Sequence, residues 1–79
     1  MKISVILPVL NEQEHLPGLL STLRSEADEL IVVDGGSTDS TLEVTRRFPA
    51  RLIQSVQGRG AQMNAGAAQT TGEILWFLH

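Results

Sequence analysis

Four short apolar segments recur along the chain and predict buried β-strands. They are rich in Ile, Val and Leu and do not alternate strictly between apolar and polar residues: Ile3–Leu7, Glu29–Val33, Arg51–Ser55 and Glu73–Leu78. Such continuous apolar runs are typical of strands covered on both faces, as in a parallel sheet. Each interval between them is long enough for one helix, which is the rhythm of successive βαβ units. The pattern therefore predicts an α/β fold.

The intervals predict three helices. Four leucines between residues 16 and 23 form one apolar stripe, and Pro17 places the regular start of this helix near Leu16 and its end near Arg24. The second helix follows a run of cap residues and ends near Phe48, directly ahead of Pro49.

The third predicted helix runs from about Gly60 to Thr70. We expect its small-residue face to lie close against the sheet and Gly72 to end the helix. This face consists of Ala61, Ala65 and Ala68.

Composition narrows the class of protein. The 79 residues allow one small domain, and 42% apolar residues are enough for a packed core. A net charge of −3 gives no electrostatic reason to expect a nucleic-acid partner, and the absence of cysteine excludes disulfides and thiolate metal ligands. The longest uninterrupted apolar run, residues 74–78, is far shorter than the roughly 20 residues of a membrane span. We therefore expect no membrane segment and a cytoplasmic location.

Polar residues and glycines gather after the predicted strands, at their carboxyl ends. In open parallel α/β sheets, ligands bind at these ends. Turns at the opposite edge, residues 25–28 and 49–50, are ordinary polar turns. The groups that predict a binding site are Pro8-Val9-Leu10-Asn11-Glu12, Asp34-Gly35-Gly36-Ser37-Thr38-Asp39, Gln57-Gly58-Arg59-Gly60 and His79.

Each group has a chemical use. Asp34 directly ends a strand, where a carboxylate can accept hydrogen bonds from a base or a ribose. The glycines after it let the backbone approach a ligand, and the following helix start favours an anion. Arg59 suits a phosphate or a polar base edge, and Glu12 suits a sugar or ribose hydroxyl.

Structural roles compete with these interpretations. Ser37, Thr38 and Asp39 are also typical helix caps, and Asn11 is also a typical turn residue. Arg59 alone would be an ordinary surface charge. Other nucleotide signatures are missing: there is no P-loop, and the run from Gly58 has Met63 where a dinucleotide fingerprint needs its third glycine.

Taken together, three motifs resemble the opening of a family 2 glycosyltransferase. They occur in the order of that family and span essentially the whole chain: Ile3-Ser4-Val5-Ile6-Leu7-Pro8-Val9-Leu10-Asn11-Glu12, Leu30-Ile31-Val32-Val33-Asp34-Gly35-Gly36-Ser37-Thr38-Asp39-Ser40-Thr41 and Gly58-Arg59-Gly60-Ala61-Gln62-Met63-Asn64-Ala65-Gly66.

The resemblance implies the N-terminal half of a GT-A fold: a Rossmann-like parallel sheet of about four strands, in the order 3-2-1-4, with helices on both faces. Members of this family transfer a sugar from a nucleotide diphosphate donor, often UDP-linked, to an acceptor hydroxyl, usually with inversion and with Mg or Mn. The resemblance implies a nucleotide-binding site made of Pro8, Val9, Glu12, Asp34, Gly35, Arg59 and Gly60.

The chain departs from the family pattern at two positions. Gly35 stands where a second Asp is common, and His79 stands where the first Asp of the acidic metal-binding motif usually lies. We therefore expect residues 1–79 to be the N-terminal nucleotide-sugar-binding part of such an enzyme, ending before its metal motif and acceptor half. This part would contain no catalytic or metal-binding residue, bind nucleotide weakly and, through exposed sheet surface, form homo-oligomers.

Three alternatives remain open. The chain could be a free-standing nucleotide-binding or regulatory module, for which UDP binding without sugar transfer would argue. It could be a fragment of a nucleotidyltransferase, although the glycine-rich loop expected after the first strand is missing. A structural fragment that binds no nucleotide is the third alternative.

Overall fold

Strands and helices alternate along the whole described chain. The computed structural model describes residues 2–70 and 73–76. The strands are β1 (Ile3–Val9), β2 (Glu29–Asp34), β3 (Arg51–Gln54) and β4 (Glu73–Trp76), and the helices are α1 (Leu16–Leu23), α2 (Thr41–Arg46) and α3 (Arg59–Ala67). The expectations for Gly72, for residues 77 and 78 of the last strand and for His79 lie outside the described residues.

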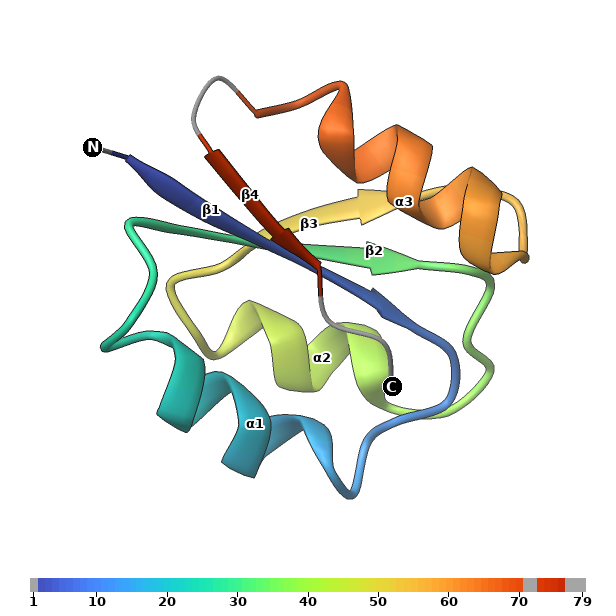
Figure 1. Cartoon of the computed structure of the whole chain (residues 1–79). Coiled ribbons are helices and arrows are strands. Elements are labelled where there is room, and N and C mark those ends of the chain that lie inside the picture. The colour runs from blue at the N-terminus through green and yellow to red at the C-terminus, as the bar shows by residue number, and fades with distance from the viewer. Residues whose placement is uncertain (1, 71–72, 77–79) are drawn as a thin grey trace.

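The four strands form one parallel sheet in the order β3-β2-β1-β4 (Figure 1), which confirms the predicted order. Val9 pairs with Asp34, and Asp34 pairs with Gln54, so β1, β2 and β3 end side by side at one edge. Both β1 and β2 are longer than predicted, since the parallel ladder continues through Pro8 and Val9 until the Gly35 N–H closes it on the Val9 carbonyl at 3.0 Å.

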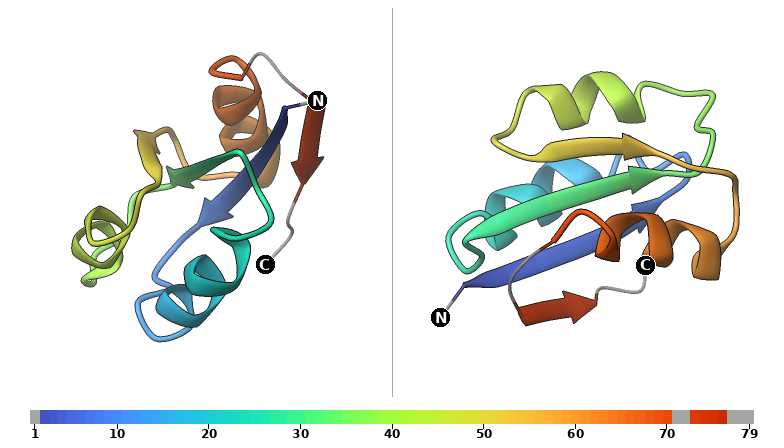
Figure 2. Two further views of the ribbon diagram at one scale, coloured as in Figure 1. Left: turned by 90° about the vertical axis from the view of Figure 1, so that its left-hand side faces the viewer. Right: turned by 90° about the horizontal axis from the view of Figure 1, so that it is seen from above.

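Helices cover both faces of the sheet, as predicted. Figures 1 and 2 show α1 and α2 on one face and α3 on the other. Successive side chains of a strand point to opposite faces. The β1 residues Val5, Leu7 and Val9 accordingly join one core cluster with the buried leucines of α1, whereas Ile6 joins Ile31 and Val33 in a second cluster. The second cluster packs against alanines of α3.

The helices are shorter than predicted at their carboxyl ends. The first begins at Leu16 with Pro17 in its first turn, as expected. The second ends at Arg46 instead of Phe48, because the Phe48 N–H bonds the carbonyl of Thr45 in a tighter turn. In the same way the N–H of Gln69 bonds the carbonyl of Gly66, and regular helix α3 ends at Ala67.

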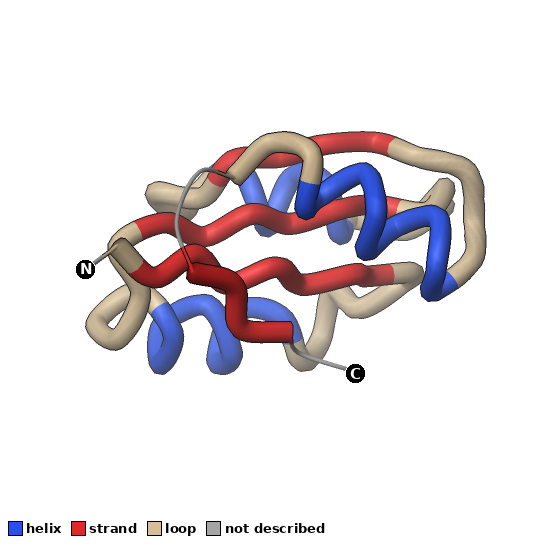
Figure 3. Tube along the Cα trace, turned by 45° about the horizontal axis from the view of Figure 1, so that its top comes forward, coloured by secondary structure: helices blue, strands red, loops and turns tan. Residues whose placement is uncertain are grey.

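The face of α3 that meets the sheet differs from the prediction. Ala65 packs against the second cluster, but Ala68 is exposed. The closest approach is made by buried Gly66, where a Cβ atom would lie 2.5 Å from Cγ2 of Ile6 and 3.0 Å from Cγ2 of Val33. Figure 3 shows how α3 crosses the strands on this face. The sheet-facing side of α3 is therefore defined by a glycine rather than by an alanine stripe.

Across residues 2–70 and 73–76, no helix has the length and apolar character needed to cross a membrane.

Candidate functional site at the carboxyl ends of the strands

An open hollow of about 170 Å³ lies beyond the carboxyl end of β1. It is lined by Pro8, Val9, Leu10, Glu12, Arg59 and Gln62. Four of the seven predicted site residues, from two segments about 50 positions apart in sequence, thus surround one space: Pro8, Val9, Glu12 and Arg59. Gln62 was not predicted.

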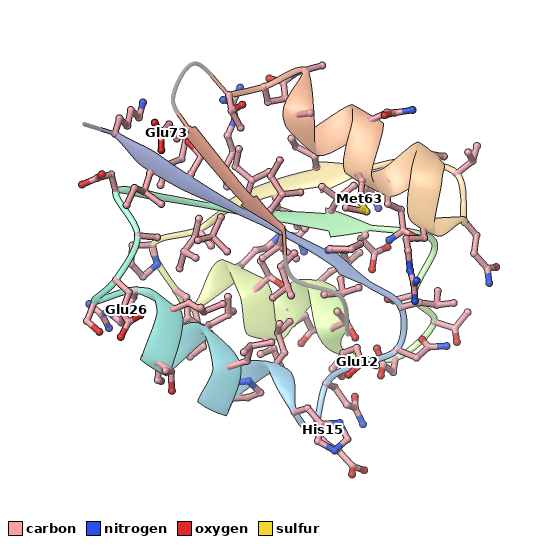
Figure 4. All side chains as sticks on the ribbon, in the orientation of Figure 1. Glu12, His15, Glu26, Met63 and Glu73 are labelled. Atoms are coloured by element: carbon pink, nitrogen blue, oxygen red, sulfur yellow. The ribbon has the colours of Figure 1, made fainter. Side chains whose placement is uncertain are left out.

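Glu12 is held in place by its own backbone. Its N–H donates to the Thr41 hydroxyl at 2.9 Å, and its carbonyl accepts the N–H of Leu16 at the start of α1. The side chain is 22% exposed, and its Oε2 lies 3.6 Å from Nδ1 of His15 (Figure 4). A half-buried carboxylate on a fixed loop can accept hydrogen bonds from ligand hydroxyl groups.

The carboxylate of Asp34 stabilises the loop that follows β2. Its carboxylate accepts the N–H groups of Gly36 and Ser37, both at 2.9 Å, and the hydroxyl of Ser37. The residue is 1% exposed. A buried carboxylate needs such donors, and here they come from Gly36 and Ser37, which follow it closely in sequence. This role in shaping the loop was not visible in the sequence, and the predicted contact with a base stays a prediction.

Hydrogen bonds join the loop after β1 to the loop after β2. Oδ1 of Asn11 accepts the N–H of Thr38 at 2.8 Å and the N–H of Asp39 at 3.3 Å, while the Asn11 N–H donates to the Ser37 hydroxyl at 2.9 Å. Oε1 of Gln13 accepts the N–H of Ser40 at 2.8 Å. Asn11 adopts φ 52°, a left-handed conformation that Asn tolerates better than most residues. Asn11 is therefore a turn residue, as its structural alternative predicted, whereas Ser37 and Thr38 bond the loop after β1 and the N-cap of α2 is Ser40.

Asp39 organises the start of α2. Its carboxylate accepts the hydroxyl and the N–H of Thr41, and it also accepts the N–H of Gln13 at 3.4 Å. The hydroxyl of Thr41 is the main cause that lowers the pKa of Asp39 below its ordinary value; burial opposes it, and hydrogen bonds from backbone N–H groups lower the pKa further. Asp39 is therefore ionised at neutral pH and adds negative charge to this edge of the sheet.

Gln62 connects three segments at the floor of the hollow. Its Nε2 donates to the carbonyls of Val9 at 3.0 Å and Val33 at 2.9 Å, and its Oε1 accepts the N–H of Gly58 at 3.2 Å. The side chain is 5% exposed. The sequence signal that could have identified it is its position four residues before Gly66, on the same face of α3.

The predicted glycines have different surroundings. Gly35 is buried, and a Cβ atom there would lie 2.7 Å from Oε1 of Gln62. Gly60 is exposed in the first turn of α3, with open space where a side chain would be. Gly58 precedes it with φ 137°, a conformation that L side chains rarely adopt. Of the two glycines in the predicted site, Gly60 is exposed and Gly35 is not.

Arg59 is the single Lys or Arg at this edge of the sheet. The other five lie at the opposite edge, beside the amino ends of the strands: Lys2, Arg24, Arg46, Arg47 and Arg51. Five carboxylates share the edge with Arg59: Glu12, Glu14, Asp34, Asp39 and Glu43. An anionic ligand in the hollow would therefore find one cationic side chain.

No group of three or more His, Cys, Asp or Glu side chains within residues 2–70 and 73–76 is arranged to hold a metal ion.

A parallel α/β sheet with polar loops and a hollow at the carboxyl ends of its strands is the architecture of nucleotide-binding proteins. Residues 4–79 match the model of the family described as glycosyl transferase family 2, and the chain belongs to this family.

Similar proteins are glycosyltransferases from archaea and bacteria. Glycosyltransferase AglE of Haloferax volcanii is 39% identical over 96% of this chain and 29% of its own length. Glucosyl-3-phosphoglycerate synthase of Mycolicibacterium smegmatis is 34% identical over 96% of this chain and 29% of its own length. This chain thus spans about 30% of the length of these relatives.

Solved structures show the same architecture. One of them is glucosyl-3-phosphoglycerate synthase of Mycobacterium tuberculosis in complex with Mn²⁺, UDP and glucosyl-3-phosphoglycerate. It matches this chain with a TM-score of 0.87 at 29% identity, and the match covers 96% of this chain and 32% of the synthase. The same enzyme with Mn²⁺, UDP-glucose and phosphoglyceric acid gives a TM-score of 0.81 at 31% identity over 90% of this chain and 30% of that one. These structures support the GT-A fold predicted from the sequence.

Proposed function

We propose that residues 1–79 form the N-terminal, nucleotide-sugar-binding part of an inverting glycosyltransferase. Such an enzyme transfers a sugar from a nucleotide diphosphate donor to an acceptor hydroxyl. The observation that carries the proposal is the hollow at the end of β1, which brings Glu12 and Arg59 together. The UDP and UDP-glucose bound in the structures of the mycobacterial synthase favour a UDP-linked donor.

The residues around the hollow contact different parts of the bound nucleotide. Pro8 and Val9 provide an apolar wall for the base, and Glu12 accepts a hydrogen bond from a ribose hydroxyl. Arg59 pairs with the diphosphate, where a charge-assisted hydrogen bond is strong. The first turn of α3 at Gly60 supplies backbone N–H groups and the positive end of the helix dipole.

Asp34 and Gly35 complete the proposed site at the end of β2. Asp34 contributes by shaping the loop and, when nucleotide binds, by accepting a hydrogen bond from the base. Gly35 contributes by leaving room for the amide of Gln62.

Binding by these residues alone does not amount to catalysis. Inverting transfer requires a base that deprotonates the acceptor and a positive charge that stabilises the leaving diphosphate. The mycobacterial structures contain Mn²⁺ or Mg²⁺ with UDP, whereas the described residues of this chain offer no cluster of metal ligands. The 79 residues therefore bind a nucleotide weakly and do not transfer sugar, and Mg or Mn acts only in the complete enzyme.

Arg59→Ala is expected to raise the dissociation constant for UDP about tenfold and to leave that for uridine unchanged, because only UDP carries the diphosphate that Arg59 pairs with. Isothermal titration of UDP, GDP and uridine into the 79-residue chain measures both constants. UDP is expected to bind more tightly than GDP.

Arg46→Ala is the matched control, since it removes the same charge at the opposite edge of the sheet. Equal effects of the two substitutions would show that only net charge matters. If wild type binds no UDP at millimolar concentration, the proposed function is wrong and the structural-fragment alternative holds. UDP binding by a complete protein that transfers no sugar would support the regulatory module.

Self-association is a further expectation from the sheet. Both β3 and β4 are edge strands, and open edges can pair with a second copy of the chain. We expect association through exposed sheet surface and these open edges. Light scattering at high concentration should give a dimer or larger species, and a purely monomeric profile would contradict the proposal.

The cytoplasmic location also stays a prediction, to be checked by cell fractionation.

A further inference from the structure

We propose that Gln62 and Gly35 act as a coupled pair that positions the loops around the hollow, and that Gln62 is a positioning residue for nucleotide binding. The inference rests on the proposed function, because its main readout is affinity for UDP. Its structural basis is independent of any ligand.

The Gln62 amide donates both of its N–H groups and accepts one hydrogen bond within the protein. The two carbonyls that it contacts, those of Val9 and Val33, belong to the ends of neighbouring strands β1 and β2. Its Oε1 holds the N–H of Gly58, the residue directly before α3. The opposite amide orientation would place Oε1 against two carbonyl oxygens, so the observed one is the one that the network requires. One buried side chain thus joins both strand ends to the start of α3.

Gly35 provides the space for this amide. A Cβ atom at Gly35 would lie 2.7 Å from Oε1, 2.8 Å from Cδ and 3.0 Å from Nε2 of Gln62. No other atom is as close, and Gly35 is not among the glycines with positive φ. The backbone φ therefore allows a side chain at position 35, and the atoms nearest to its Cβ would be those of the Gln62 amide. The two residues are complementary: the glycine is needed because the glutamine is present.

The Gln62 amide influences where Arg59 lies relative to the hollow. Arg59 lies between Gly58, which Gln62 holds, and the body of α3, so its distance from the wall formed by Val9 depends on this amide. A binding site that is already assembled does not lose free energy in ordering its loops when the ligand arrives. Misplacement of a binding group by about 1 Å is enough to weaken its interaction strongly.

The first test replaces Gln62 by methionine, which has a similar length and no hydrogen-bonding amide. The dissociation constant for UDP, measured by calorimetry well below the unfolding temperature, is expected to rise about tenfold. Asn64→Ala removes an exposed amide of the same helix and should change affinity less than about twofold. Leu23→Ala truncates a buried side chain of α1, on the opposite face of the sheet from α3, and serves as the destabilised control that leaves the Gln62 bonds in place.

The second test uses the pair. Gly35→Ala is expected to weaken UDP binding, because its methyl group displaces the Gln62 amide. In the double variant Gly35→Ala/Gln62→Ala the methyl group meets no amide, so its affinity should equal that of Gln62→Ala alone. Strict additivity of the two single effects would overturn the coupling.

A third readout needs no nucleotide. Hydrogen exchange of the Gly58 amide is expected to accelerate in Gln62→Met and to stay slow, relative to global stability, in Leu23→Ala. If wild type binds no UDP, the proposed function fails while this measurement still tests the pair. If Gln62→Met and Leu23→Ala lose UDP affinity to the same extent, and the Gly58 amide exchanges at the same rate in both, Gln62 has only a structural role and the inference is overturned.

Discussion

Replacing Asp34 by alanine should lower the free energy of unfolding by about 3 kcal/mol, a large part of the stability of a domain of this size. The substitution removes the common acceptor of two N–H groups and one hydroxyl in a buried position. Each hydrogen bond to a charged group contributes about 1.5–3 kcal/mol, and bonds that share one acceptor do not add fully. Urea denaturation followed by circular dichroism measures the loss.

Two variants separate the causes of this loss. Asp34→Asn keeps the shape and one acceptor oxygen, so we expect an intermediate stability. Glu14→Ala removes an exposed carboxylate at the same edge of the sheet and should change stability by no more than about 0.5 kcal/mol. An Asp34→Ala protein as stable as wild type would show that the loop does not depend on the carboxylate.

The same Asp34 variants decide whether the carboxylate also contacts the base. Ser37→Ala disrupts the loop hydrogen bond but leaves the carboxylate of Asp34 in place. If Asp34 binds the base directly, Asp34→Ala weakens UDP binding far more than Ser37→Ala does. Equal UDP affinity of wild type and Asp34→Ala would remove Asp34 from the nucleotide site.

Gly66→Ala is expected to lower the free energy of unfolding by about 2 kcal/mol. A Cβ atom at this position would lie 2.5 Å from Cγ2 of Ile6, closer than any real contact, so α3 must move away from the sheet. Overpacking of a core typically costs about 1–3 kcal/mol, which exceeds the gain of up to about 1 kcal/mol from the better helix propensity of alanine. Thermal or urea unfolding gives the value.

Gly60→Ala is the matched control, because it makes the same substitution in the same helix at a position with open space. We expect it to be neutral or to stabilise the protein by up to about 1 kcal/mol. Ile6→Leu removes the Cγ2 atom at fixed side-chain volume, so the double variant Gly66→Ala/Ile6→Leu should recover part of the loss. A stabilised Gly66→Ala protein would show that α3 does not pack as closely as the structure indicates.

The fold was largely predictable because its signals are local. Apolar runs defined all four strands within a few residues, and the leucine stripe with Pro17 fixed the start of α1. The strand order followed from the resemblance to the family rather than from the apolar pattern. Helix ends were less accurate, because tighter turns after Arg46 and Ala67 depend on single backbone hydrogen bonds.

The location of the candidate site was also contained in the sequence. Parallel strands place all their carboxyl ends at one edge, so loops that follow strands meet there whatever their separation along the chain. This reasoning brought Pro8, Val9 and Glu12 beside Arg59, as the structure shows.

Only the tertiary structure decided what the individual polar groups do. Asp34 binds the loop after it, Asn11 holds a loop 26 to 28 positions away, and Gln62 reaches carbonyls 29 and 53 positions away. Neither residue type nor local spacing specifies such partners. The sequence determined at which edge of the sheet the candidate binding residues lie, because residues that follow a strand in sequence must lie at its carboxyl end. Packing alone determined which polar atoms are engaged there, because a buried donor or acceptor bonds whatever group the folded chain brings within about 3 Å.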